Sequence, residues 1–390
     1  MIAEVRKAWP FLLIGPALIL IRIPSADSLL VDIVAYATGL VLLLQFVLLG
    51  RSRKTGIAAW LFVGFLGWAI STLAWSPDIA RGSRFVALAA VAILAFLWAR
   101  ATGPPADHRG VMLAGLVGLG LAVVALLAFP DPALVGGLNP DRVLGMAAVP
   151  LAIAAWYAPH RRWAALLIGA LALGTAILSG SRTASFVVAL LLVTLPALRL
   201  RVAGRSLLAA LLVGGLFLAS LTAGFQERWF ETGEGNLLDI VTFQNMDTSG
   251  RTDTWSALAE RCGPTLLGNG AGASDSWARQ INEGFPEPHN EYLRIWCDTG
   301  IPGSLLLWGG FVLALWTSLQ SQRARPSPLH RAALQGIAAV VVIAATDNPL
   351  TTTLPFMVPI AILMGWSVAA ANRPLPIRSR RGTMAIGTHD

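Results

Sequence analysis

One histidine of this chain stands in a setting suited to proton transfer. His289 lies in Phe285-Pro-Glu-Pro-His-Asn-Glu-Tyr-Leu293, directly before an apolar run. The prolines on its N-terminal side restrict the backbone, and imidazole takes up and releases protons near neutral pH. The segment therefore predicts a general base, although a solvated loop histidine is the alternative. The other four of the five histidines are His108, His160, His330 and His389.

Arginines in unusual places form the second chemical signal. By the topology derived below, ten arginines lie on the same side of the membrane as His289, and several stand at the ends of apolar runs where charge is costly. A guanidinium can hold the oxygens of a phosphate in two parallel hydrogen bonds. Snorkelling to lipid headgroups or pairing with a loop acid is the alternative for each one taken singly. The ten are Arg22, Arg81, Arg84, Arg142, Arg182, Arg228, Arg251, Arg261, Arg279 and Arg294.

The elements that must position these residues are membrane-spanning helices. Of the 390 residues, 55% are hydrophobic and only 13% are charged. A soluble domain cannot bury that much apolar surface, whereas a helix of roughly 20 apolar residues crosses a bilayer. The sequence predicts an all-α polytopic membrane protein with twelve spans. They cover residues 9–23, 28–49, 56–75, 83–100, 110–129, 143–158, 162–179, 184–199, 205–224, 301–320, 331–346 and 353–371.

The distribution of basic residues predicts the orientation. Of 29 Lys and Arg, 19 fall at the two ends and in every second connection, which places both ends in the cytoplasm. The net charge of +8 is therefore a topology signal rather than a sign of nucleic-acid binding. We expect spans one to nine in 1–224, a large periplasmic and mostly helical loop in 225–300, three more spans in 301–371 and a disordered cytoplasmic tail in 372–390. The N-terminus is expected to be a span rather than a cleaved signal peptide.

The large loop is acidic and holds both cysteines. It has twelve Asp and Glu against five Arg, and we expect most of the acids to form a solvated face. An anionic ligand would therefore need a local cluster of arginines, for which Arg182 and Arg251 are the best candidates. Cys262 and Cys297 lie in an oxidising compartment under this topology, so a disulfide is plausible, but their spacing alone leaves it open.

Four motifs in this order resemble the O-antigen ligase superfamily. Ser249-Gly-Arg-Thr-Asp-Thr-Trp255, followed by Pro264-Thr-Leu-Leu-Gly-Asn-Gly-Ala-Gly272, is similar to the outer-loop helix and glycine turn of that family. Pro288-His-Asn-Glu-Tyr-Leu293 with Thr299-Gly-Ile-Pro-Gly303 and the Gly180-Ser-Arg-Thr183 connection also resemble its motifs. Asn139-Pro-Asp-Arg-Val-Leu-Gly145 resembles a further segment, but Asp141 and Arg142 depart from the pattern, which leaves their role open.

The resemblance implies a glycosyltransferase on the periplasmic face of the bacterial inner membrane. Such an enzyme moves a glycan from undecaprenyl pyrophosphate to an acceptor hydroxyl, which inverts the anomeric carbon if the attack is direct. By position in the motifs, Arg182 and Arg251 would stabilise the leaving diphosphate and His289 would take the proton. The residues expected to bind substrate are Asn139, Arg142, Asn290, Arg84 and Arg22.

We expect neither a cofactor nor a metal. Another class of lipid-linked glycosyltransferase binds a divalent ion through an acidic pair in its first outer loop. Here residues 22–28 contain one acid, Asp27, and no outer acidic cluster has convincing metal-ligand spacing. Arginines can replace the charge of the metal.

Three functions compete with one another. Twelve spans with both ends inside are common in transporters and lipid flippases. Carriers built of two halves have any long middle connection in the cytoplasm, after the sixth span. In this chain the long connection is expected outside, after the ninth span. Within the enzyme class, a ligase that uses lipid A–core and an O-antigen or exopolysaccharide polymerase share the same donor. The resemblance favours the ligase, and the absence of an appended soluble domain speaks mildly against protein glycosylation.

Overall fold

In the residues that it describes, the computed structural model consists of helices joined by turns and loops. The described residues are 28–49, 56–105, 109–128, 140–156, 162–179, 181–194, 214, 250–283, 287–351 and 353–371. The elements are α2 (Ser28–Leu49), α3 (Ile57–Thr72), η1 (Leu73–Trp75), α4 (Ile79–Thr102), α5 (Arg109–Ala128), α6 (Pro140–Trp156), α7 (Arg162–Leu178), α8 (Arg182–Thr194), α12 (Arg251–Cys262), α13 (Ala273–Ile281), α14 (Glu291–Ala324), α15 (Pro328–Ala344), η3 (Thr353–Met357) and α16 (Val358–Ala371). The all-helical class predicted from composition is confirmed for this part of the chain.

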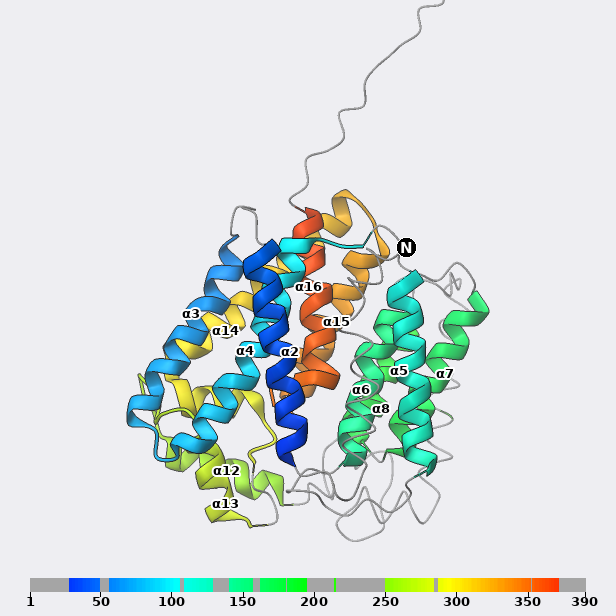
Figure 1. Ribbon diagram of the computed structural model, residues 1–390. Helices are drawn as coiled ribbons and strands as arrows, with labels where there is room; N and C mark the ends of the chain where they lie inside the picture. The colour runs from blue at the N-terminus through cyan, green and yellow to red at the C-terminus, as the bar shows by residue number, and fades with distance from the viewer. Residues whose placement is uncertain are drawn as a thin grey trace, which may run out of the picture.

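The helices form two groups that lie side by side (Figure 1). In the first group α16 and α2 pack on α4, and α14 packs on α3. In the second group α5 packs on α6, and α6 and α8 both pack on α7. Helix α15 joins the groups, because it contacts α14 and α16 on one side and α6 and α8 on the other. The segment after α15 therefore lies where the groups meet.

Three of the described helices are long and apolar enough to cross a membrane. They are Ile57–Trp75, Ile79–Thr102 and Glu291–Ala324, and seven shorter apolar helices accompany them. Ten of the twelve predicted spans overlap described helices. The predicted spans 9–23 and, apart from residue 214, 205–224 lie outside the described residues, as does the predicted tail 372–390. The number of spans thus stays a prediction.

Helix α4 illustrates how the local sequence builds these elements. The side chain of Asp78 accepts a hydrogen bond from the backbone N–H of Arg81 at 3.1 Å, which caps the N-terminus, and the helix ends at Gly103. Its buried face carries small residues, including Ala89, Ala92 and Ala99. Small side chains let neighbouring helices approach closely in a membrane, and α2, α16 and the outer loop all reach α4.

Helix α14 contains a sharp turn at Gly300. This residue has φ 63°, and a Cβ there would lie 2.4 Å from the Gly268 backbone nitrogen. The rings of Tyr292 and Trp308 lie 4.5 Å apart between centroids, although 16 residues of straight helix would separate them by roughly 24 Å. The chain therefore runs in one direction from Glu291 to Gly300 and then folds back along itself.

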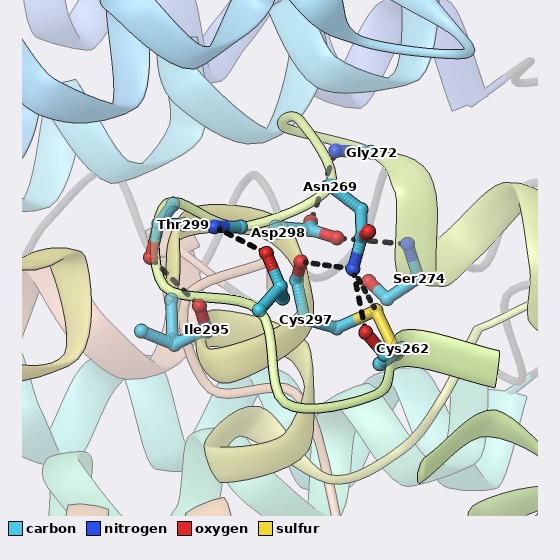
Figure 2. The surroundings of a disulfide bond; sticks show 10 residues. Cys262, Asn269, Gly272, Ser274, Ile295, Cys297, Asp298 and Thr299 are labelled. Carbon is cyan, nitrogen blue, oxygen red and sulfur yellow. Dashed lines mark hydrogen bonds between the residues drawn. A yellow bond between two sulfur atoms is a disulfide. The ribbon is translucent and has the colours of Figure 1, made fainter. Parts of the chain in front are cut away.

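A disulfide between Cys262 and Cys297 fastens the outer loop at this turn. The bond, which the sequence left open, joins the end of α12 to α14 with the two Cα atoms 5.2 Å apart. The Asn269 side chain donates to the carbonyl oxygens of both cysteines at 3.2 Å, as Figure 2 shows. Next to it, the Asp298 carboxylate accepts from the backbone N–H groups of Gly272 and Ser274 at 2.9 and 2.8 Å (Figure 2).

Replacing both cysteines by serine should loosen this attachment. Because the bond closes a loop of 35 residues, we expect the Cys262→Ser/Cys297→Ser variant to lose about 2–4 kcal/mol of stability, read as a lower Tm of the detergent-purified protein. A reducing agent should lower the Tm of the wild type and leave that of the variant unchanged. An equal Tm for the two proteins under oxidising conditions would contradict the stabilising role of the disulfide.

Candidate active site

Three segments distant in sequence meet at the turn that follows α15. Arg251, at the start of α12, donates from Nη1 to the carbonyl oxygen of Thr346 at 2.8 Å. The hydroxyl of Thr183, in the first turn of α8, shares a hydrogen bond of 2.8 Å with the Thr346 hydroxyl. Arg182 directly precedes Thr183 and is half-buried. The structure thus brings Arg251 into direct contact with this turn and places Arg182 next to a residue that contacts it.

His289 reaches the next residue of the same turn. Its Nδ1 lies 3.3 Å from Oδ1 of Asp347, and its side chain is 18% exposed. When the proton of the neutral ring is on Nδ1, His289 donates to the carboxylate and keeps a lone pair on Nε2. This arrangement suits a base, because Asp347 orients the ring and stabilises the positive charge that forms on proton uptake.

The backbone of His289 is strained. Its φ of 49° makes it the one residue other than glycine with a positive φ in the described part of the chain. A left-handed conformation costs a residue with a Cβ about 1–2 kcal/mol. Strain of this kind persists only where surrounding contacts hold it, and it is concentrated at functional sites. The conformation therefore supports a functional role for His289 over that of a solvated loop residue.

Asp347 is buried and ionised. Burial raises the pKa of its carboxyl, but the hydrogen bond and charge of His289, the charge of Arg251 and the Asn348 backbone N–H together outweigh burial. The pKa of Asp347 consequently lies below its usual range. The Asn348 N–H donates to Asp347 Oδ1 at 2.9 Å, which fixes the orientation of the carboxylate.

A second cluster of charges lies buried between α13 and the first part of α14. Arg294 is fully buried and is ion-paired with Asp275, and its Nη2 lies 3.9 Å from Glu287 Oε2. Glu291 and Asp298 are also fully buried. The expectation that most loop acids form a solvated face is therefore wrong for these residues. The positive charge of Arg294 compensates the charge of Asp275 and lies close to Glu287, as burial of ions requires.

The predicted substrate-binding residues have varied positions. Asn290 caps α14 by accepting from the Leu293 N–H at 3.1 Å, so it has a structural task. Arg84, on α4, is half-buried, and its charge lowers the pKa of Glu287. Arg142 is in the first turn of α6. Arg22 and Asn139 lie outside the described residues.

An aromatic groove runs between α12 and both arms of α14. It adjoins His289 in sequence and space, since Asn290 is in its lining and Trp255 donates from Nε1 to the carbonyl oxygen of Pro288 at 2.5 Å. Past it, α14 exposes apolar side chains, among them Leu305 and Val312. The groove is lined by Trp255, Ser256, Ala259, Asn290, Tyr292, Leu293, Trp296, Ser304 and Trp308.

The turn at which these residues meet was not among the positions predicted from the sequence. Thr346, Asp347 and Asn348 stand between two apolar runs, and Asp347 is the only acid between residues 301 and 371. An acid at the end of an otherwise apolar span is costly and marks a functional position, so this signal could have been found.

Within the described ranges, no group of three or more His, Cys, Asp or Glu side chains is arranged to hold a metal ion. The positive charges that act on Asp347 in this turn come from Arg251 and, when protonated, His289. The expectation of a reaction without metal stays a prediction.

The helices and the site are those of a multi-helix membrane protein in which Arg251 and a His–Asp pair meet at one polar turn. Residues 167–308 match the family model described as O-antigen ligase. This match covers most of α7, all of α8, α12 and α13, and the first half of α14. It confirms the resemblance to the O-antigen ligase superfamily and supports an O-antigen ligase- or polymerase-like function. With the membrane-span helices, it indicates a protein of the bacterial inner membrane. No curated protein matches the chain.

The lowered pKa of Asp347 predicts how stability depends on pH. A carboxylate with a lowered folded-state pKa contributes stability above its ordinary pKa of about 3.9 and loses it as the pH falls through the folded-state value. We expect Asp347→Asn to be less stable than the wild type by about 1–3 kcal/mol at pH 7. The difference in Tm between the two should shrink below pH 4.

Thermal unfolding in detergent between pH 3 and 7 measures this effect. Asp253→Asn is the matched control, because Asp253 is an exposed acid on α12 and should change the Tm little at any pH. A difference between wild type and Asp347→Asn that stays constant across the range would contradict an ionised Asp347.

Proposed function

We propose that this protein is a glycosyltransferase that moves a glycan from undecaprenyl pyrophosphate to the hydroxyl of lipid A–core. It is thus an O-antigen ligase, acting on the periplasmic face of the inner membrane with both termini in the cytoplasm. The observation that carries the proposal is the convergence of Arg251, Thr183 and His289 on residues 346–347, within a chain that matches the O-antigen ligase model.

The proton of the acceptor goes to His289. Nε2 takes it from the acceptor hydroxyl, while Nδ1 keeps its hydrogen bond to Asp347. The acceptor oxygen then attacks the anomeric carbon from the face opposite the diphosphate. Its new bond to carbon forms as the bond from carbon to the diphosphate oxygen breaks, so the configuration inverts.

The electron pair of the broken bond leaves with undecaprenyl pyrophosphate. Negative charge grows on the diphosphate, and Arg251 and Arg182 stabilise it. The hydrogen bond from Arg251 to the Thr346 carbonyl orients its guanidinium before the substrate arrives. Arginine stays charged at every relevant pH, so these residues supply the cationic stabilisation without a metal ion.

The aromatic groove supports a lipid-linked substrate. Tryptophan and tyrosine favour the boundary between lipid and water, and α14, which forms one wall, is a candidate membrane span. A substrate anchored in the bilayer could approach along the exposed apolar side of α14 and place its polar end beside Asn290 and His289. The family match favours this enzyme over the transporter alternative.

Substitution of any of the three proposed residues should slow transfer strongly. In a purified assay with a lipid-linked donor and lipid A–core, we expect His289→Ala to lower kcat about 10²–10⁴-fold. Arg182→Ala and Arg251→Ala should each lower it about 10²–10³-fold. Arg279→Ala, an exposed arginine on α13, is the control and should stay near wild type. Wild-type rates in His289→Ala would exclude the proposed base.

The choice of acceptor separates a ligase from a polymerase. We expect product analysis to show glycan joined to lipid A–core, and little product when a second lipid-linked repeat unit is the only acceptor. The opposite preference would make the protein a polymerase that uses the same donor. Absence of product with either acceptor, in protein that binds the donor, would contradict glycosyl transfer altogether.

A further inference from the structure

We propose that Glu287 and Asn348 are positioning residues that hold His289 in its strained, reactive orientation. The inference rests on the proposed function, which assigns the proton transfer to His289. Glu287 Oε2 accepts a hydrogen bond from Asn348 Nδ2 at 2.9 Å, here called the 287–348 bridge. Neither residue is part of the reaction described above.

The 287–348 bridge lies next to the contact between His289 and Asp347 and joins the same two segments. Glu287 is two residues before His289, and Asn348 is the residue after Asp347. The loop before α14 and the turn after α15 are thus joined by side-chain hydrogen bonds at two neighbouring positions, 287 with 348 and 289 with 347. A third contact follows, because Glu291 Oε2 accepts from the Leu350 N–H at 3.2 Å. His289 is fixed on both sides in the chain.

These contacts explain how the left-handed backbone of His289 persists. Its φ of 49° is unfavourable for a residue with a side chain, so contacts elsewhere must hold it. Pro288 fixes its own φ and restricts Glu287, and its carbonyl oxygen accepts from Trp255. Without the 287–348 bridge, the loop could relax to an ordinary conformation and turn the imidazole away from Asp347.

The 287–348 bridge is shielded from water. Asn348 is 1% exposed, and the Glu287 side chain is 17% exposed. Burial raises the pKa of the Glu287 carboxyl, but Arg294, His289, the hydrogen bond of Asn348 and Arg84 outweigh it, so the pKa is lowered. An ionised Glu287 strengthens the bond from Asn348. Arg84 and Arg294 therefore act on His289 indirectly: they keep Glu287 ionised, and ionised Glu287 holds Asn348 and the backbone beside His289.

Kinetics of matched variants test the bridge. We expect Glu287→Ala and Asn348→Ala each to lower kcat 10- to 100-fold, with KM for the lipid-linked donor within threefold of wild type. Glu287→Gln keeps an oxygen that can accept from Asn348 and should recover most of the lost kcat. The double variant should be no worse than the worse single variant, because both substitutions break the same bond. Glu283→Ala, an exposed acid of the same loop, is the control.

Chemical modification of His289 tests the same point without an activity assay. We expect diethyl pyrocarbonate to modify His289 several-fold faster in both alanine variants than in wild type or Glu283→Ala, measured by peptide mass spectrometry on protein with an unchanged Tm. Unchanged modification rates in both alanine variants would overturn the positioning role, whatever the kinetics. Faster modification in a protein whose wild type transfers no glycan would keep the positioning role and reject the proposed function.

Discussion

The carboxylate of Asp347 is the group on which the arrangement of the site depends. It is buried at the end of an apolar helix, where an ionised acid is stable only with compensating charge and hydrogen bonds. His289, Arg251 and the Asn348 N–H provide that compensation. Since these partners come from different parts of the chain, the need to compensate one buried charge brings α12 and the loop before α14 to the same turn.

The surrounding membrane protein makes such convergence necessary. Backbone and side-chain polar groups at the ends of spanning helices need partners within the protein, because lipid offers none. At the end of α15, the carbonyl and hydroxyl of Thr346 are bonded by Arg251 and Thr183, and the Leu350 N–H by Glu291. The polar turn is thus both a structural junction between the two groups of helices and the place where reactive side chains gather.

The described part of the loop before α14 is attached firmly to the turn of that helix. The disulfide, the side chain of Asn269 and the buried Asp298 fasten α12 and α13 to the turn of α14 at Gly300 (Figure 2). The position of Arg251, at one end of α12, therefore depends on contacts at its other end. The return of α14 along itself also builds the groove between its two arms.

Much of the fold and part of the site could be predicted from the sequence. Apolar runs predict the helices because a segment that lies in lipid must be apolar along its own length. Ten of the predicted runs overlap described helices. The chemistry of His289 and of the arginines follows from residue type and motif. Asp347 and the fate of the loop acids could not be predicted, because a carboxylate exposed to water and one buried against Arg294 look alike in sequence.

The helical class, the family resemblance and the set of side chains able to move a proton or hold a phosphate all follow from the amino-acid sequence alone. These properties reside in single residues and in short runs of the chain. The contacts of His289 with Asp347, of Arg251 and Thr183 with Thr346, and of Asn348 with Glu287 depend instead on how the chain folds in three dimensions. Such pairings join residues up to 163 positions apart, and they form because packed helices bring buried charges and polar groups to one another.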